Sequence, residues 1–347
     1  MENETAWLPP ELDLVALRLA RADQAAFQMS DLSLGWSRGI SGPGPFELVQ
    51  VERPTGELDL VISDIRPIPP LVSMLFSEAI HHLRAAIDNT LFHLVEAERG
   101  EIIPEPQARD IAMPIYEERK KFTDWQKQKA KKGLRELAAG TRIGRRVESL
   151  QPYVDVTAAI PSINPQLAAL MGVRPEYTHP MLLLQKYSNN DKHRAIQMAA
   201  ARANLQRGDE AFASSDRSMR PFVVGDILTT GRRGTPVVVE TVAAVHVLRE
   251  QGAIWVAPGV ELHHLHRYVS NVVIPTLVKG FALTRSLPPE IDLGDTGQTA
   301  AERIRAASWI PAHERMVEIS KAAYRESLTT APQFLPVVQS TADMGFN

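Results

Sequence analysis

The 347-residue sequence contains no cysteine. This absence excludes a disulfide framework, a thiolate nucleophile and any zinc site with sulfur ligands, and it favours a cytoplasmic location. No apolar run approaches the roughly 20 residues that a membrane-spanning helix needs, and the acidic residues 1–10 lack the pattern of a signal peptide. We therefore expect a cytoplasmic protein without a membrane partner.

The sequence motifs of several enzyme classes are missing as well. The chain has no GxxxxGKS or GxxxxGKT phosphate loop, no GxGxxG after a strand and no GxSxG elbow. Histidines do cluster at 81–82 and 263–266. However, adjacent histidines on a helix point about 100° apart, and no HExxH pattern accompanies them. We therefore expect neither a metal nor a cofactor.

Positive charge is concentrated in one segment. Between Arg119 and Arg146 the chain has 11 Lys or Arg residues against two acidic ones, a local balance of +9, whereas the whole chain carries −3. Such an excess favours an anionic partner, RNA or an acidic protein, but it is also typical of a solvated helix face. The cations expected to contact nucleic acid are Lys120, Lys121, Lys127, Lys129, Lys131, Lys132, Arg145 and Arg146.

Hydrophobic periodicity predicts an α+β fold. Period-two alternation on both sides of the turn Pro54-Thr55-Gly56 predicts a hairpin with strands within about 46–62, and further alternation predicts strands at 222–256. Residues 158–178, rich in proline, are expected to form an irregular loop that covers part of the site. The helical spacing of apolar residues predicts helices at 11–36, 71–98, 117–150 with breaks at Gly133 and Gly140, 180–203, 262–283 and 299–328.

These elements suggest two parts. Residues 10–285 should form a core of long antiparallel helices with one small antiparallel sheet, to which both halves of the chain contribute strands. Residues 286–347 should form a C-terminal helix and a tail. We expect this second part to swing free or to join a partner chain.

Ionisable side chains gather in two of the expected helices. Arg84 and Asp88 are four residues apart and Asp191 and Arg194 are three apart, so each pair can form along its helix. One interpretation is a buried ion network with His193, which joins the helices and only stabilises the core. The other is a cleft in which the carboxylates hold His193 or Arg194 for acid/base or phosphate chemistry.

Three sequence runs carry a resemblance to known proteins: HHLRAAIDN at 81–89, LQPY at 150–153 and NNDKHR at 189–194. In this order they resemble a family of actinobacterial-type proteins without an assigned activity, over about residues 10–285. More distantly, the paired long helices are similar to HEPN domains, which are helical RNases and RNA-binding modules of bacterial defence and toxin systems. That similarity implies a homodimer that binds RNA, or cleaves it without a metal or cofactor.

The similarity to HEPN domains also implies catalytic roles. A ribose 2′-hydroxyl can attack its own phosphate once a base removes the proton and a cation stabilises the phosphorane. His193 would be the acid/base, Arg84 and Arg194 would stabilise charge, and Asp191 and Asp88 would orient these groups.

Overall fold

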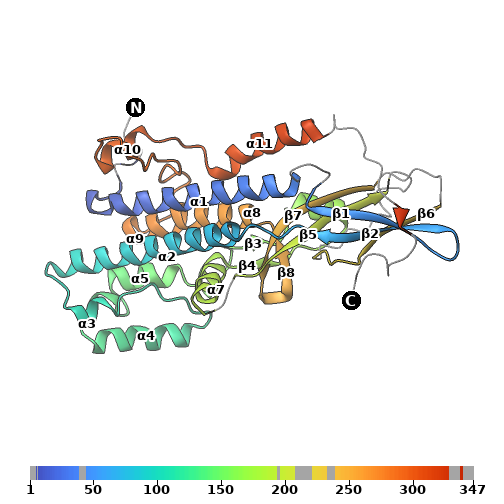
Figure 1. Ribbon diagram of the computed structural model, residues 1–347. Helices are drawn as coiled ribbons and strands as arrows, with labels where there is room; N and C mark the ends of the chain where they lie inside the picture. Colours follow the sequence, from blue (N-terminus) through green and yellow to red (C-terminus); the bar gives the residue numbers. More distant parts are fainter. Residues whose placement is uncertain are drawn as a thin grey trace.

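Helices fill one end of the molecule and strands the other (Figure 1). The computed structural model describes residues 5, 7–38, 44–193, 196–207, 221–232, 239–327 and 337–338. The helices are α1 (Asp13–Arg38), α2 (Pro70–Arg99), α3 (Glu105–Ala108), α4 (Arg119–Lys131), α5 (Arg142–Ser149), α6 (Pro165–Met171), α7 (Pro180–His193), α8 (Pro258–Tyr268), α9 (Ile274–Lys279), α10 (Ala300–Ala306) and α11 (Ala312–Ser327). The strands are β1 (Phe46–Glu52), β2 (Glu57–Ile65), β3 (Ile160–Pro161), β4 (Tyr177–Thr178), β5 (Met198–Arg207), β6 (Ile227–Arg232), β7 (Val239–Arg249), β8 (Ile254–Val256) and β9 (Val337–Val338). The predicted α+β fold is confirmed.

The long helices α1 and α2 form the centre of the core. In α2 the expected apolar stripe is confirmed, because Phe76, Leu83, Ile87 and Leu91 are each at most 1% exposed. The helix ends where Gly100 adopts a left-handed conformation with φ of 74°, which glycine tolerates without a steric cost. None of the helices in the described part of the chain is long and apolar enough to cross a membrane.

Smaller helices form layers on this pair. Helices α8 and α9 lie behind α1 and α2, α10 and α11 lie over α1, and α4 and α5 lie on the opposite side, below α2 (Figure 1). Between α8 and α9 the residues Val269–Val273 form a π-helical turn just before Pro275. One nearly continuous helical segment therefore runs over 258–279, where a helix at 262–283 was predicted. The predicted breaks near Gly133 and Gly140 separate α4 from α5 and are confirmed.

The strands form separate sheets, and the expectation of one shared sheet is wrong. The predicted hairpin β1–β2 is confirmed, and β6 joins it in the order β6-β2-β1-β9. Strands β7 and β8 instead pair with β5 in a second sheet, and β3 and β4 form a third. The partner of β7 was predicted wrongly because most of β5 lies in a segment that the sequence pattern assigned to a helix.

The helix predicted at 180–203 stops at His193, and Met198 begins β5. Asn189, Asn190 and Asp191 are weak helix formers, because their short polar side chains compete for backbone hydrogen bonds. The alanines and methionine after them favour a helix, yet Met198 and Ala200 pair with Val247 and Val245 of β7. Pairing with a strand rich in β-branched residues therefore overrides the local preference.

Two other segments differ from expectation. The proline-rich residues 158–178 contain helix α6, which Asn164 caps by accepting hydrogen bonds from two backbone N–H groups. The helix predicted at 299–328 is divided into α10 and α11 around Pro311, which cannot continue a helix. Leu287, Ile291 and Ile304 are buried in the same core cluster as α1 and α2, while a domain boundary near 285 stays a prediction.

Candidate functional site

Arg84 and Asp88 pair along α2 and together hold one residue of the connection to α4. The Arg84 Nε lies 3.1 Å from the Asp88 Oδ2. Arg84 also donates to the Met113 carbonyl at 2.5 Å, and the Met113 backbone N–H donates to Asp88 Oδ1 at 2.8 Å. The two side chains are 18% and 29% exposed, so the pair is half-buried. Both backbone groups of Met113 are therefore fixed to α2.

Gln151, from the LQPY run, holds the next residues in the same way. Its side chain is fully buried. The amide oxygen accepts from the Tyr116 N–H at 3.0 Å, and the amide nitrogen donates to the carbonyls of Pro114 and Val147 at 3.0 and 2.9 Å. Two of the three sequence runs thus bind the segment 113–116, which leads directly into α4.

The NNDKHR run lies at the end of α7. Asp191 is exposed, only the backbone of His193 is described, and Arg194 lies outside the described residues. Within the described part of the chain, Arg84 and Asp88 bind each other and Met113 rather than α7. The structure therefore brings together Arg84 and Asp88 from the predicted catalytic set, and the roles of His193, Arg194 and Asp191 stay predictions.

The predicted cationic segment divides into a buried side and an exposed side. Phe122, Trp125, Gln126 and Lys129 form the buried side of α4. The Lys129 amine donates to the Asp110 carbonyl at 2.5 Å. This hydrogen bond offsets the cost of removing the amine from water. The exposed predicted cations are Lys120, Lys121, Lys127, Lys131, Lys132 and Arg145.

Arg146, predicted to contact nucleic acid, is also engaged inside the protein. Its guanidinium donates to the carbonyls of Leu277 and Val278 at 2.9 Å, near the end of α9. These last helical carbonyls have no partner within their own helix, so a cation there is favourable. Burial is the main cause that lowers the pKa of Arg146, and repulsion from Arg142 is the second. The geometry gives Lys129 and Arg146 internal partners and leaves the other six on the surface.

A second network, which sequence reasoning missed, is fully buried. Arg249 and Glu261 are 1% and 2% exposed, and the Arg249 Nη2 lies 2.6 Å from the Glu261 Oε2. The Tyr187 hydroxyl donates to Glu261 at 2.9 Å. Burial, and secondly the negative charge of Glu261, raise the pKa of Tyr187. A signal was present in the sequence, because Arg249 continues the inward-facing alternation of Val245 and Val247 along β7.

Histidines of α8 meet α11 beside α1. The rings of His263 and His313 lie 4.8 Å apart, centroid to centroid. Burial, followed by the neighbouring His313, lowers the pKa of His263 to about 4. Asp23 of α1 accepts a hydrogen bond from the Ala312 N–H at 2.8 Å and pairs with Arg315. Together these contacts seat α11 on the body of the protein.

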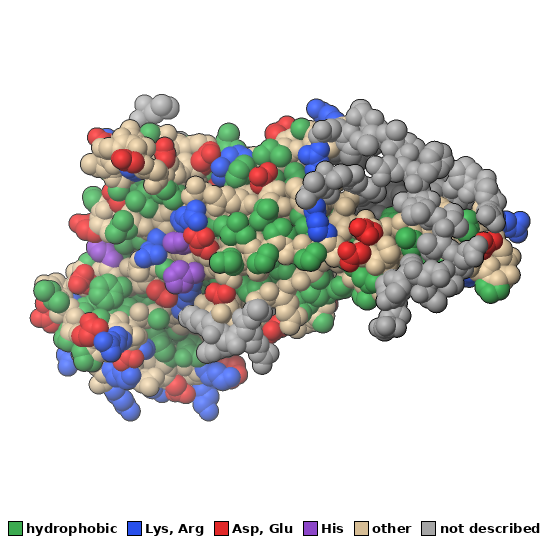
Figure 2. All heavy atoms as spheres, viewed as in Figure 1, with side chains coloured by type: hydrophobic (Ala, Val, Ile, Leu, Met, Phe, Trp, Pro, Cys, Tyr) green, Lys and Arg blue, Asp and Glu red, His purple; other side chains and the backbone are tan. Residues whose placement is uncertain are grey.

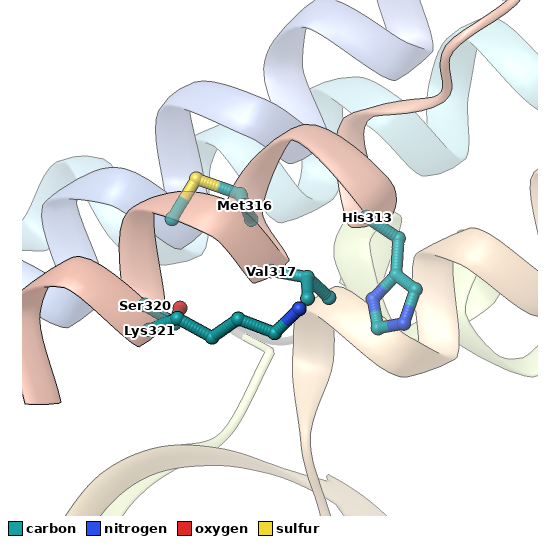
Figure 3. A pocket seen from close by; sticks show the side chains of 5 residues that line it. All are labelled: His313, Met316, Val317, Ser320 and Lys321. Carbon is teal, nitrogen blue, oxygen red and sulfur yellow. The ribbon is translucent and has the colours of Figure 1, made fainter.

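An open cavity of about 370 Å³ adjoins this contact and shares His313 with it. Figure 3 shows the His313 ring and the Lys321 amine on the same side of α11, with Val317 between them. Among the described residues, no group of three or more His, Asp or Glu side chains could hold a metal ion.

The chain matches no protein-family model, no curated protein and no solved structure. The resemblance carried by the three runs therefore stays a prediction, as do the homodimer and the cytoplasmic location.

Proposed function

We propose that the protein binds the phosphate backbone of RNA through the exposed face of α4, without a catalytic step by Arg84 or Asp88. The observation that carries this proposal is a row of solvent-facing lysines on a helix fixed from behind. Helix α4 contains six basic residues and one acidic residue. Figure 2 shows Lys and Arg side chains along the lower edge of the molecule, over this helix. We call this surface the lysine face; its residues are Lys120, Lys121, Lys127, Lys131 and Lys132.

Lys121 and Lys127 of the lysine face can exchange their present partners for phosphates at little cost, whereas Lys132 pairs at 2.8 Å with Asp110, whose side chain is only 30% exposed. Lys121 pairs with Glu118 and Lys127 with Asp124 across one helical turn, and all four side chains are more than half exposed. Exposed ion pairs contribute little to stability, typically about 0–1 kcal/mol. Phosphates that replace such carboxylates release their own counterions, which favours binding.

The position of the lysine face is fixed by contacts with α2. Arg84 and Asp88 hold Met113 before α4. After α4, Arg99 donates to the Gly133 carbonyl at 2.8 Å and pairs with Glu136 at 2.9 Å. A surface that is already ordered loses less conformational freedom when it binds. On this proposal the conspicuous polar residues of α2 are positioning residues for the lysine face.

The geometry also supports binding without sequence preference. From Lys120 to Lys131 the helix rises about 16 Å, at 1.5 Å per residue, which spans several phosphates. The aromatic rings of Phe122 and Trp125 are buried, so they offer no platform for stacking bases. Affinity should therefore depend on phosphates and on salt, and weakly on base identity.

The experiment is fluorescence anisotropy with labelled single-stranded and duplex RNA of about 20 nucleotides, titrated between about 50 and 200 mM salt. The test variant is Lys120→Glu/Lys127→Glu/Lys131→Glu. The matched control is Arg305→Glu/Lys321→Glu/Arg325→Glu, whose exposed side chains lie on α10 and α11, across the molecule from α4.

We expect the test variant to bind at least tenfold more weakly and to reduce the slope of log K against log salt by about two to three, roughly one for each lost phosphate contact. The control should bind like wild type. A salt-independent affinity, or equal losses in both variants, would refute the lysine face as the binding surface. Incubation of RNA with wild type and His193→Ala in EDTA tests the predicted cleavage separately.

A further inference from the structure

A groove lies at the opposite end of the α1–α2 pair from the strands, where α1 begins beside the end of α2. It encloses about 600 Å³, within the range of about 300–1,000 Å³ typical of binding sites. The buried side chains of Leu12 and Val15 form part of its floor. Leu14 and Ile102 stand at its edge and are 67% and 86% exposed. Two large apolar side chains thus face solvent beside a hollow with an apolar floor.

The ionisable side chains of the lining are three carboxylates and His93, with no lysine or arginine. Glu11 lies on the α1 side, and Glu96 and Glu101 lie on the α2 side. Within the described part of the chain, none of the three forms an ion pair. Next to them, partial burial and then Glu11 raise the pKa of Asp13, as expected where carboxylates crowd together. The orphan carbonyls at the end of α2 add negative potential, and the free N–H groups at the start of α1 oppose it.

The groove runs along helices, with helical spacing. On α2 its lining residues recur every three or four positions, at Asn89, Phe92, Glu96 and Gly100. These positions span about 16 Å, or three helical turns, at 1.5 Å per residue. An apolar groove along helices can receive the apolar face of an amphipathic helix. At the left end of Figure 2, hydrophobic, acidic and histidine side chains lie next to one another over the start of α1 and the end of α2.

We infer that this groove binds a basic amphipathic helix of a protein partner. Leucine-like side chains on one face of that helix would cover Leu14 and Ile102, and flanking Lys or Arg side chains would meet Glu96 and Glu101. Phosphate ligands are disfavoured by the negative lining, so this surface is distinct from the lysine face. The inference does not rest on RNA binding.

The probe is a labelled peptide of about 18 leucine and lysine residues, long enough to form a helix, with leucines at helical spacing. A second peptide carries glutamate in place of every lysine. Both are titrated against the full-length chain, and sedimentation equilibrium of the protein alone measures self-association. The groove variants are Leu14→Ser/Ile102→Ser and Glu96→Gln/Glu101→Gln. The controls change similar exposed residues elsewhere, in Leu71→Ser/Met74→Ser and Glu250→Gln/Glu314→Gln.

We expect one lysine peptide to bind per chain, and the glutamate peptide to bind at least about tenfold more weakly, a difference of about 1.4 kcal/mol. Each groove variant should weaken the lysine peptide at least about fivefold, while the controls leave it unchanged. Equal binding of both peptides, or equal losses in groove and control variants, would overturn the inference. Self-association that Leu14→Ser/Ile102→Ser abolishes would also overturn it, because a second copy would then be the occupant.

Discussion

The pairs Arg249–Glu261 and Arg84–Asp88 have the same chemistry in different surroundings. The first pair is almost fully buried and also binds the Tyr187 hydroxyl. The second is partly exposed and holds the backbone of Met113. A buried pair leaves a costly uncompensated charge when one partner is removed, whereas water can solvate a half-exposed one. Burial therefore decides which pair supports the core and which one positions a surface element.

The largest effect should follow from Glu261→Ala. This change strands the Arg249 cation at 1% exposure and removes the acceptor of the Tyr187 hydroxyl. We expect a loss of about 3–5 kcal/mol in the free energy of unfolding, measured by urea denaturation. The double variant Arg249→Met/Glu261→Leu should recover part of that loss, because no isolated charge remains. A loss below about 1 kcal/mol would show that water reaches the pair.

A smaller effect is expected for Asp88→Ala. The variant removes the acceptor of the Met113 N–H, but Arg84 keeps its bond to the Met113 carbonyl and some contact with solvent. The expected loss is about 1–3 kcal/mol, typical of a lost hydrogen bond to a charged group. Glu118→Ala, which breaks an exposed pair with Lys121, serves as the control and should not change stability measurably.

Asp88→Ala also distinguishes a role in positioning α4 from a role in a core network with α7. The reason is that Met113, the residue that Asp88 binds, begins the segment that leads to α4. Amide hydrogen exchange should show reduced protection near residue 113, without a matching change in α7. Losses as large as those of Glu261→Ala, or increased exchange confined to α7, would restore the interpretation of Arg84 and Asp88 as a core network with the NNDKHR run.

The mildest change concerns pH and the contact between α8 and α11. The pKa of His263 falls from 6.5 to about 4 in the folded chain, mainly because the ring is buried. Repulsion from the neighbouring cations lowers it further; these neighbours are His313, His264, His266 and Arg267. Asp23 lines the same small cavity. A proton therefore binds the unfolded chain more tightly, and the stability that this group contributes is complete above pH 6.5 and lost as the pH falls toward 4.

Thermal melts at pH 7.5 and 5 should show this loss, and His263→Leu should reduce the difference between the two melting temperatures. The exposed His81→Phe serves as the control. An unchanged pH dependence in His263→Leu would mean that other titrating groups account for the loss.

The sequence pattern was sufficient where one face of an element is buried along its whole length. The periodicity of α1 and α2 and the Pro-Thr-Gly turn of the first hairpin predicted those elements, since local pattern and tertiary burial agree there. It failed at 198–203, where Met198 and Ala200, which favour a helix, pair with Val247 and Val245 of β7. Nothing local distinguishes these alternatives, because the deciding partner lies more than 40 residues along the chain.

The candidate site was harder to predict than the fold. The density of ionisable residues drew attention to Arg84 and Asp88, and the structure does place them together. Their actual partner, Met113, was invisible because it binds through its backbone. Charge counting likewise could not separate Lys129 and Arg146, which bind internal carbonyls, from the lysines that face solvent.

The seating of α11 on Asp23 has a consequence for the order of events on the ribosome. Asp23 is 4% exposed in the finished chain, yet its hydrogen-bond donor at Ala312 lies 289 positions later. At about 5–20 residues per second, translation separates the two by roughly 15–60 s. During that interval α1 presents its unpaired carboxylate, and the apolar surface around it, to solvent or to chaperones. Nascent chains arrested before residue 312 should therefore be the form that chaperones hold longest.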